Sequence, residues 1–342
     1  MLNSPPTQEK ILHRFVLSSV IGVVTILFLH PCFAEETLRY EPVVEGDWWS
    51  VTGNPDLGTL TGTNQQPVDF AVWQAADGTF QLWSCIRNIK APGKTRLLHR
   101  WEGKSITEIN WKPMGIAMQA DTALGEEENG LQAPYVFKEG DKYLMFYGSW
   151  NHICMATSSD GKTFERVINS EGKSGLFTSA LYNPRDPMVI KYGSLYLCYY
   201  CAHDAKDDKT DRPKSAVFCR TSMDLKNWSD EIVVSRGGSV YNMTWYGGDT
   251  ECPFVVEMDG QYILFRNQRY KPNAWNTQYS SGNPFDFGVN SDKYMVGSMP
   301  IAAPEVIKVG NQYYIFALKP ELDGIQAAKL QFNKKSFPVI RK

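Results

Sequence analysis

The 342-residue chain lacks the sequence features of several common functional classes. It has no block of lysine and arginine, and its formal net charge is −2, so a nucleic-acid partner is not expected on electrostatic grounds. A phosphate-binding loop, a dinucleotide fingerprint and a Ser-His-Asp nucleophile elbow are also absent. Helical periodicity is scarce. What remains is short alternating or apolar runs separated by Gly, Asp, Asn and Pro, which is typical of β-strands.

Cysteine is present but forms no metal or redox motif. The pair in CYYC (198–201) lies in a run typical of a strand, where positions three apart face opposite sides. A domain of this size needs no disulfides even after export, so we expect buried free thiols. Beyond the N-terminal segment the cysteines are Cys85, Cys154, Cys198, Cys201, Cys219 and Cys252.

Residues 1–34 have the layout of a signal peptide. Lys10, His13 and Arg14 precede the apolar run FVLSSVIGVVTILFL (15–29), and Ala34 precedes two glutamates. A basic start, a short apolar stretch and a small residue at the end are typical of a cleaved leader. The run is short for a membrane-spanning helix, and an uncleaved anchor is the alternative. We therefore expect a secreted or periplasmic protein, free of the membrane after cleavage, with one domain at 35–342.

No cofactor or metal is predicted from the sequence. The segment DAKDDKTDRPK (204–214) is rich in acidic residues, so a structural calcium ion is conceivable there. The segment lacks the glycine-centred pattern of a calcium loop, however, and a solvated loop between strands is the simpler interpretation. The sequence leaves the oligomeric state open.

A repeat of five segments organises the rest of the chain. Each has a short residue, usually before proline, then an apolar strand, a Gly or Asp turn and an aromatic strand. The starts are about 50 to 65 residues apart, near the upper end of propeller repeats. The five segments are VDFAVWQAADGTFQLWS (68–84), QAPYVFKEGDKYLMFYG (132–148), RDPMVIKYGSLYLCYYC (185–201), ECPFVVEMDGQYILFRN (251–267) and AAPEVIKVGNQYYIFAL (302–318).

A second repeated pattern lies between these hairpins. ATSSDGKTF (156–164), RTSMDLKNW (220–228) and QYSSGNPFDF (278–287) share a serine, a polar turn and an aromatic residue. We interpret them as outer strands, so that two inner and two outer strands make one four-stranded antiparallel blade. Five such blades predict an all-β, five-bladed β-propeller. The alternative is a β-sandwich with accidental self-similarity.

Aligning the five segments at the first position of the inner strand brings out three acids. The occupants are Asp69, Ala133, Asp186, Glu251 and Ala303. In a propeller these positions converge near the axis, so the three carboxylates are expected to share a central pocket. Like charges raise one another's pKa values, which lets one carboxyl stay protonated while another is ionised. Glycosidic cleavage needs that combination, although the acids could instead only cap turns.

Two short motifs resemble those of known glycosidases. RDP (185–187) is similar to the motif of glycoside hydrolase family 32 that carries a transition-state-stabilising Asp, and EC (251–252) is similar to its acid/base motif. The repeat pattern resembles the five-bladed propeller hydrolases of families 32, 43 and 68. This resemblance implies Glu251 as proton donor, Asp69 as base or nucleophile and Asp186 as stabiliser.

One feature of family 32 is missing from the chain. Its nucleophile motif, Asn-Asp-Pro-Asn-Gly, is absent, and the similar letters GNPDLG (53–58) place Asp56 before the repeat position, so we prefer Asp69. Whether Asp69 attacks the sugar (retaining) or activates water (inverting) stays open, because the carboxyl separation decides this.

Aromatic, basic and polar residues near the inner hairpins are candidate sugar contacts, with solvated loop residues as the alternative. Trp48 and Trp49 could wall the pocket or close the ring. We expect a secreted glycoside hydrolase acting on furanoside, pentoside or fructan-type oligo- or polysaccharides. The alternatives are a non-catalytic carbohydrate-binding propeller and a scaffold for protein partners. The candidate contacts are Trp73, Arg87, Trp150, His152, His203, Trp245, Asp249, Arg266 and Arg269.

Overall fold

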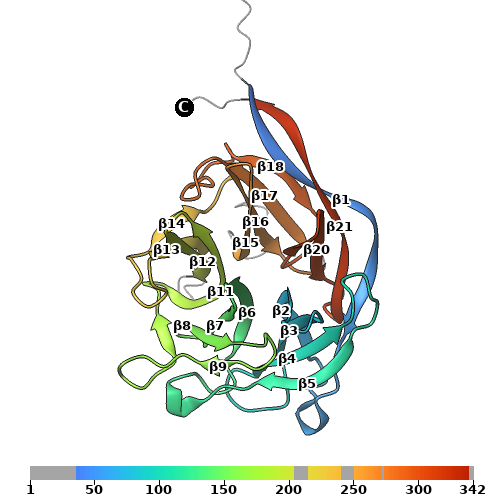
Figure 1. The fold of residues 1–342 in the computed structure, drawn as a ribbon, viewed down its shortest axis with the longest axis vertical. Coiled ribbons are helices and arrows are strands. Elements are labelled where there is room, and N and C mark those ends of the chain that lie inside the picture. Colours follow the sequence, from blue (N-terminus) through green and yellow to red (C-terminus); the bar gives the residue numbers. More distant parts are fainter. Residues whose placement is uncertain (1–35, 204–214, 240–249, 272, 339–342) are drawn as a thin grey trace, which may run out of the picture. The chain divides into compact units, whose positions relative to one another are not determined.

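The computed structural model describes residues 36–203, 215–239, 250–271 and 273–338, which form a five-bladed β-propeller (Figure 1). The predicted all-β fold is therefore confirmed. The predicted signal peptide (1–34) and the acidic segment 204–214 lie outside the described residues. Within the described ranges, no helix has the length and apolar character needed to cross a membrane. The helical elements there are two short 3-10 turns, η1 (Gly58–Leu60) and η2 (Thr122–Leu124).

Each blade is an antiparallel sheet that begins with an inner strand near the axis. Blade 1 contains β2 (Gln66–Gln74), β3 (Phe80–Arg87), β4 (Arg96–Gly103) and β5 (Lys112–Met118). Blade 2 contains β6 (Gln132–Glu139), β7 (Lys142–Gly148), β8 (Ile153–Ser158) and β10 (Gly175–Phe177), and β9 (Glu165–Arg166) also pairs with β8. Blade 3 contains β11 (Tyr182–Tyr192), β12 (Leu195–His203), β13 (Ser215–Ser222) and β14 (Ile232–Ser235). Blade 4 contains β15 (Glu251–Met258), β16 (Gln261–Arg269), β17 (Trp275–Ser281) and β18 (Met295–Met299).

The N-terminal strand completes the fifth blade. Blade 5 contains β19 (Glu305–Val309), β20 (Gln312–Leu318), β21 (Gly324–Pro338) and β1 (Glu36–Gly53), and β1 pairs with β21 along most of its length. Trp49 of β1 packs edge-on against Tyr314 with ring centroids 6.2 Å apart. Trp48 lines a surface cavity beside Val44 and Ile301. Of the two roles proposed for these tryptophans, ring closure is the one that the structure confirms.

The five repeated segments are the inner hairpins, as predicted, and glycine sets their turns. The turn that joins β15 to β16 holds Asp259 and Gly260 at φ 49° and 75°, between the paired residues Met258 and Gln261. A two-residue turn with both residues in the left-handed region matches the twist of an antiparallel hairpin. The three predicted outer strands are also confirmed, as β8, β13 and β17.

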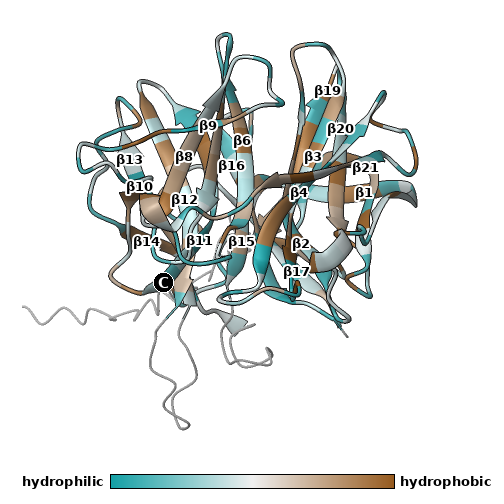
Figure 2. Cartoon of the chain, turned by 90° about the horizontal axis from the view of Figure 1, so that it is seen from below, coloured by the Kyte–Doolittle hydropathy of each residue, from teal (hydrophilic) through white to brown (hydrophobic). Residues whose placement is uncertain are grey.

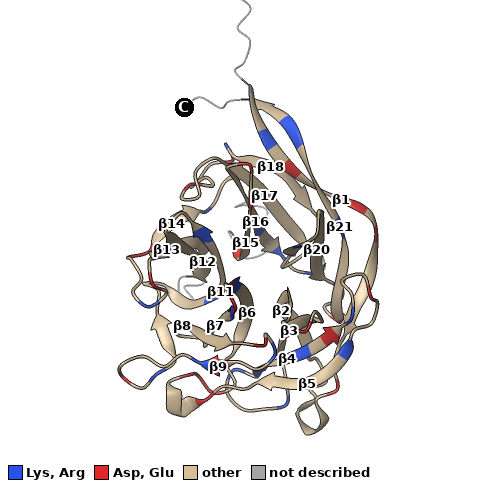
Figure 3. Cartoon of the chain, viewed as in Figure 1, with Lys and Arg blue, Asp and Glu red and all other residues tan. Residues whose placement is uncertain are grey.

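Blades stack face to face, so most strands bury both of their faces. On β7, Met145 and Tyr147 pack toward blade 1, whereas Leu144 and Phe146 pack toward blade 3. Successive side chains of a strand point to opposite faces, which explains why these strands are apolar runs with little alternation. In Figure 2 hydrophobic stretches lie along the strands, and in Figure 3 charged residues lie mainly on loops and outer strands.

Glu305 is a half-buried acidic residue at the edge of this apolar interior. It begins β19 and lines the cavity between the starts of the inner strands as well as the opening beside Tyr135 and Lys308. Burial raises the pKa of Glu305 well above its ordinary value, although the backbone N–H of Val72 donates a hydrogen bond to the carboxylate. The folded state therefore holds the proton of Glu305 more tightly than the unfolded chain does.

We expect Glu305→Gln to stabilise the protein in a pH-dependent way. The pKa of a glutamate in the unfolded chain is near 4.3, and that of Glu305 in the folded protein is higher. Below the unfolded pKa the carboxyl is protonated in both states and costs the fold nothing. As pH rises through the folded pKa, the folded state loses stability relative to the unfolded chain. The variant should therefore match the wild type near pH 4 and gain about 1 kcal/mol or more in unfolding free energy by pH 8, because one pKa unit corresponds to about 1.4 kcal/mol. Urea unfolding at several pH values measures this. A difference that does not change with pH would contradict the expectation.

Candidate active site

Near the start of each inner strand, one residue other than glycine has a left-handed backbone conformation, with positive φ. Positive φ is uncommon for residues other than glycine, and such strained positions cluster at functional sites. In four blades the sheet register shifts next to this residue. The five residues and their φ angles are Asp69 (37°), Ala133 (46°), Asp186 (56°), Cys252 (46°) and Ala303 (47°).

The fourth member of this ring corrects the sequence alignment. The alignment placed Glu251 at the repeat position, but the structure places Cys252 there and Glu251 one residue earlier. The signal was in the sequence: Ala133, Asp186, Cys252 and Ala303 all directly precede proline, and Glu251 does not. Two carboxylates and a thiol, rather than three carboxylates, therefore occupy equivalent positions.

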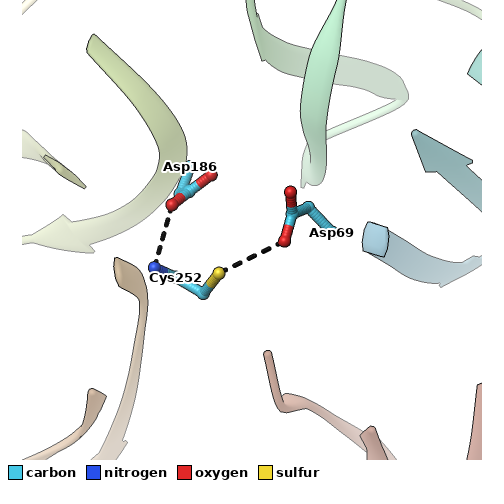
Figure 4. A group of neighbouring side chains, drawn as sticks. All are labelled: Asp69, Asp186 and Cys252. Atoms are coloured by element: carbon cyan, nitrogen blue, oxygen red, sulfur yellow. Dashed lines mark hydrogen bonds between the residues drawn. The ribbon is translucent and has the colours of Figure 1, made fainter. Parts of the chain in front are cut away.

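The two aspartates and Cys252 converge around the axis (Figure 4). The Cys252 thiol donates a hydrogen bond to Asp69 Oδ1 at 3.3 Å, and the backbone N–H of Cys252 donates to Asp186 Oδ2 at 2.9 Å. One ligand atom from each of the three residues lies within 4.8 Å of the others. The hydroxyl of Tyr270 also donates to Asp69 Oδ1, at 3.1 Å. Carboxylates from blades 1 and 3 thus meet as predicted.

Asp186 is the buried carboxylate of the pair, with 7% of its surface exposed. Its Oδ2 accepts hydrogen bonds from the Cys201 thiol at 2.9 Å and from the Cys252 backbone, whereas Oδ1 has no hydrogen-bond partner among the described residues. Burial, followed by the charge of Asp69, raises the pKa of Asp186 above its ordinary value, against the opposing charge of Arg185. The raised pKa thus belongs to Asp186, whereas the resemblance implied Glu251 as the protonated carboxyl.

Glu251 is held by an arginine that the candidate residues did not include. Arg185 Nη2 donates to Glu251 Oε1, its Nη1 lies 2.9 Å from His203 Nδ1, and its Nε lies 3.8 Å from Asp186 Oδ2. Burial raises the pKa of Glu251, but Arg185, with smaller contributions from His203 and Arg87, holds it below its ordinary value. Without substrate, Glu251 is therefore an ion-paired carboxylate.

The structure brings some of the predicted contact residues toward this cluster. Arg87 donates two hydrogen bonds to Gln66 Oε1, at 2.9 and 2.8 Å, and lies close enough to affect Glu251. His203 contacts Arg185 and stands edge-on to Tyr182 at 5.5 Å.

Trp150, another predicted contact residue, has well-defined neighbours in the structure. Its indole N–H donates to the Tyr182 hydroxyl at 2.7 Å, and Lys94 and Arg96 lie over its ring at 4.6 and 5.2 Å. His152 is half-buried beside Gly175.

Other predicted contacts are corrected. Trp73 is 5% exposed, donates to the Gly161 carbonyl at 2.8 Å and lines the opening that Tyr135 and Lys308 also line, not the carboxylate cavity. Arg266 is fully buried and donates to Ser235 Oγ at 2.8 Å, so it stabilises the fold instead of contacting a ligand.

The remaining candidates have no established place at the site. Arg269 is half-buried with its guanidinium over the Trp275 ring, at 5.7 Å from the centroid. Trp245 and Asp249 lie outside the described residues.

Four site residues were missed by sequence reasoning: Arg185, Cys201, Cys252 and Tyr270. Arg185 is part of RDP, and its proximity to a predicted acid was the available signal. The expectation of free thiols is confirmed for the six cysteines of the described residues. Cys198 packs in an apolar cluster, whereas Cys201 reaches Asp186, so these two cysteines do face opposite sides of β12.

The cavity among the inner-strand starts is small. Its volume is about 30 Å³, and it is lined by the five left-handed residues together with the residues that follow them. A space of this size accommodates a single water molecule or ion. It is too small for a sugar ring, so a substrate would have to bind outside it, against the more exposed side chains of the cluster.

Comparison with known proteins connects this geometry with glycoside hydrolases. No protein-family model matches the sequence. The chain is 27% identical over 202 residues to sucrose-6-phosphate hydrolase of Vibrio alginolyticus, covering 55% of this chain and 36% of that protein. It is 25% identical over 194 residues to a probable arabinan endo-1,5-alpha-L-arabinosidase A of Aspergillus flavus, covering 54% of this chain and 57% of that protein. The match therefore spans roughly a third to just over half the length of these relatives.

Solved structures extend the likeness to most of the chain. A thermostable family-43 glycoside hydrolase superposes with a TM-score of 0.59 and 15% identity, covering 85% of this chain and 98% of that one. The Bombyx mori family-32 beta-fructofuranosidase BmSUC1 superposes with a TM-score of 0.53 and 17% identity, covering 88% and 62%. The propeller of this protein is thus the fold found in glycoside hydrolases of families 43 and 32, as the sequence motifs suggested.

Proposed function

We propose that this protein is an exported glycosidase that cleaves O-glycosidic bonds of furanoside, pentoside or fructan-type substrates. The observation that carries the proposal is the meeting of Asp69 and Asp186 at the propeller axis, with Glu251 linked to Asp186 through Arg185. The relatives support it, because one is named as a hydrolase of sucrose 6-phosphate and the other as an arabinan endo-hydrolase. The propeller fold that this chain shares with solved hydrolases of families 43 and 32 is consistent with the proposal.

Differences in exposure suggest how the three carboxylates divide the work. The Glu251 side chain is 21% exposed and that of Asp186 is 5% exposed, while Asp69 is half-buried. A proton donor must touch the leaving oxygen and a nucleophile or base must reach the anomeric carbon or a water. We therefore assign Glu251 as proton donor and Asp69 as nucleophile or base. Asp186 does not contact the reacting atoms in this scheme. It acts through the effect of its charge on the other two carboxyls and through the hydrogen bond that positions the Cys252 backbone.

Arg185 sets a condition on this mechanism. Glu251 must carry a proton to donate it, and the ion pair with Arg185 favours the ionised form. Substrate binding must therefore weaken this pair, and a sugar hydroxyl that accepts a hydrogen bond from the guanidinium would do so. Arg185 then becomes a substrate ligand while Glu251 is freed to protonate the glycosidic oxygen.

Glu251→Gln and Asp69→Asn are expected to abolish most hydrolysis. Loss of a general acid or base typically lowers the rate by about 10²- to 10⁴-fold. Release of aryl leaving groups from a panel of aryl furanosides and pyranosides, with fructans alongside, measures the effect and identifies the sugar. Glu257→Gln on the exposed side of β15 and Asp141→Asn in an exposed turn are matched controls.

Two outcomes would count against the assignment. Unchanged hydrolysis in both site variants would contradict the roles given to Glu251 and Asp69. Binding of oligosaccharides without hydrolysis by the wild type would favour the alternative, a non-catalytic carbohydrate-binding propeller.

Arg185→Met is expected to move the pH profile of kcat/KM. Activity falls as Glu251 loses its proton at rising pH, and removal of the neighbouring positive charge raises the pKa of Glu251. The basic limb should therefore shift upward by about one pH unit or more. Arg185→Lys keeps a charge and should shift it less. A lower rate with an unmoved basic limb would show that Arg185 only supports the structure.

A further inference from the structure

We propose that Asp69, Asp186 and Cys252 form a binding site for one thiophilic divalent cation of the Zn²⁺ and Cd²⁺ class, and that this cation inhibits the enzyme. The binding part of this inference stands on the geometry of the three side chains alone. The inhibition rests on the proposed function, because it assumes that Asp69 takes part in hydrolysis.

The spacing of the donor atoms suits a small cation. One oxygen from each aspartate and the Cys252 sulfur lie within 4.8 Å of one another, and the sulfur lies 3.3 Å from Asp69 Oδ1. Zinc binds carboxylate oxygen at about 2.0–2.2 Å and thiolate sulfur at about 2.3 Å in tetrahedral sites, so its ligand atoms lie roughly 3.3–3.8 Å apart. Small side-chain adjustments would therefore complete a three-ligand site, with the proton of the Cys252 thiol released to solvent as the sulfur binds the cation.

A separate observation also points to a cation. In the part of the chain that the structure describes, the buried Asp186 Oδ1 has no hydrogen-bond partner, and in Figure 4 this second oxygen points away from Cys252, on the side of Asp69. A buried carboxylate oxygen without a partner is costly, and a neighbouring carboxylate adds repulsion. A cation between the two carboxylates would offset both the cost of the unpartnered oxygen and the repulsion between the negative charges. The cavity of about 30 Å³ that these residues line has room for one ion.

The thiol selects the class of cation. Calcium and magnesium take oxygen ligands, whereas thiolate favours zinc and cadmium. At the equivalent left-handed positions of blades 2 and 5 the chain has Ala133 and Ala303, so Cys252 is the feature that adds a sulfur ligand to the acid pair. The Tyr270 hydroxyl, 3.1 Å from both the Cys252 sulfur and Asp69 Oδ1, stands beside the site.

Occupation of this site would remove Asp69 from chemistry. A carboxylate that ligates a divalent cation cannot attack an anomeric carbon or accept a proton from water with its full basicity. The cation would also introduce positive charge next to the oxocarbenium-like transition state of glycoside cleavage, which is destabilising. Inhibition should therefore affect kcat and should be reversed by a chelator.

Cadmium titration of the full-length protein tests the site directly. Cadmium bound to thiolate absorbs in the near ultraviolet, so we expect a charge-transfer band that saturates at one ion per chain. Cys252→Ala, which places at this position the residue found in blades 2 and 5, should abolish the band and weaken binding roughly tenfold or more. Cys219 is a buried thiol that bonds only a backbone carbonyl among the described residues. The control variant Cys219→Ala should therefore leave both the absorption band and the cadmium affinity unchanged. Asp69→Asn should weaken binding while keeping the band.

The outcomes separate this inference from the proposed function. A band that Cys252→Ala leaves intact, or equal competition by Ca²⁺, would overturn the site, and circular dichroism of each variant shows that it is folded. Binding that depends on Cys252 in a protein without glycosidase activity would support the site and refute the proposed function. Hydrolysis that Cd²⁺ leaves unchanged at saturation would overturn the inhibitory role.

Discussion

The candidate site depends on keeping two carboxylates close together in a largely buried position. Asp69 and Asp186 come from blades far apart in sequence, and the left-handed backbone at each directs both toward the axis. Their repulsion is offset by hydrogen bonds from two thiols, a phenol and one backbone amide. These donors hold the acids without neutralising them. Of the two acids, only Asp186 has a salt bridge among the described residues, to Arg185 Nε at 3.8 Å, so the charge of the pair is only partly balanced.

Arg185 connects the paired aspartates with Glu251. Its guanidinium faces Asp186, Glu251 and His203 at once, so the charge of each group affects the others. Asp186 and Glu251 therefore titrate as a pair instead of as two independent acids. In the proposed mechanism, a sugar that engages Arg185 would change the protonation of Glu251, and binding of the substrate would thereby activate the acid.

Much of the fold could be predicted because it repeats. Five hairpins with the same turn chemistry specify five blades, and the sequence alone located Asp69 and Asp186. The register of Glu251 was misplaced by one residue because the alignment followed the acidic residues, whereas the proline after Ala133, Asp186, Cys252 and Ala303 marks the equivalent position. The burial of individual side chains could not be predicted either. Trp73 and Arg266 have the residue types of sugar contacts, but the packing between blades encloses both side chains. Arg185 was missed because its ion-pair partner Glu251 lies 66 residues away in the sequence.

The pairing of β1 with β21 bears on how the chain folds as it is made. Glu36 pairs with Pro338, so the first strand finds its partner only when nearly the whole sequence has been synthesised. Until then blade 5 lacks a strand, and the edge of β1 is open to wrong partners. Long-range pairing of this kind slows folding, since the entropy of closing the chain is lost before the contacts form. Once β1 has paired with β21, the first and last described strands hold each other in one blade, so neither can separate without breaking that pairing.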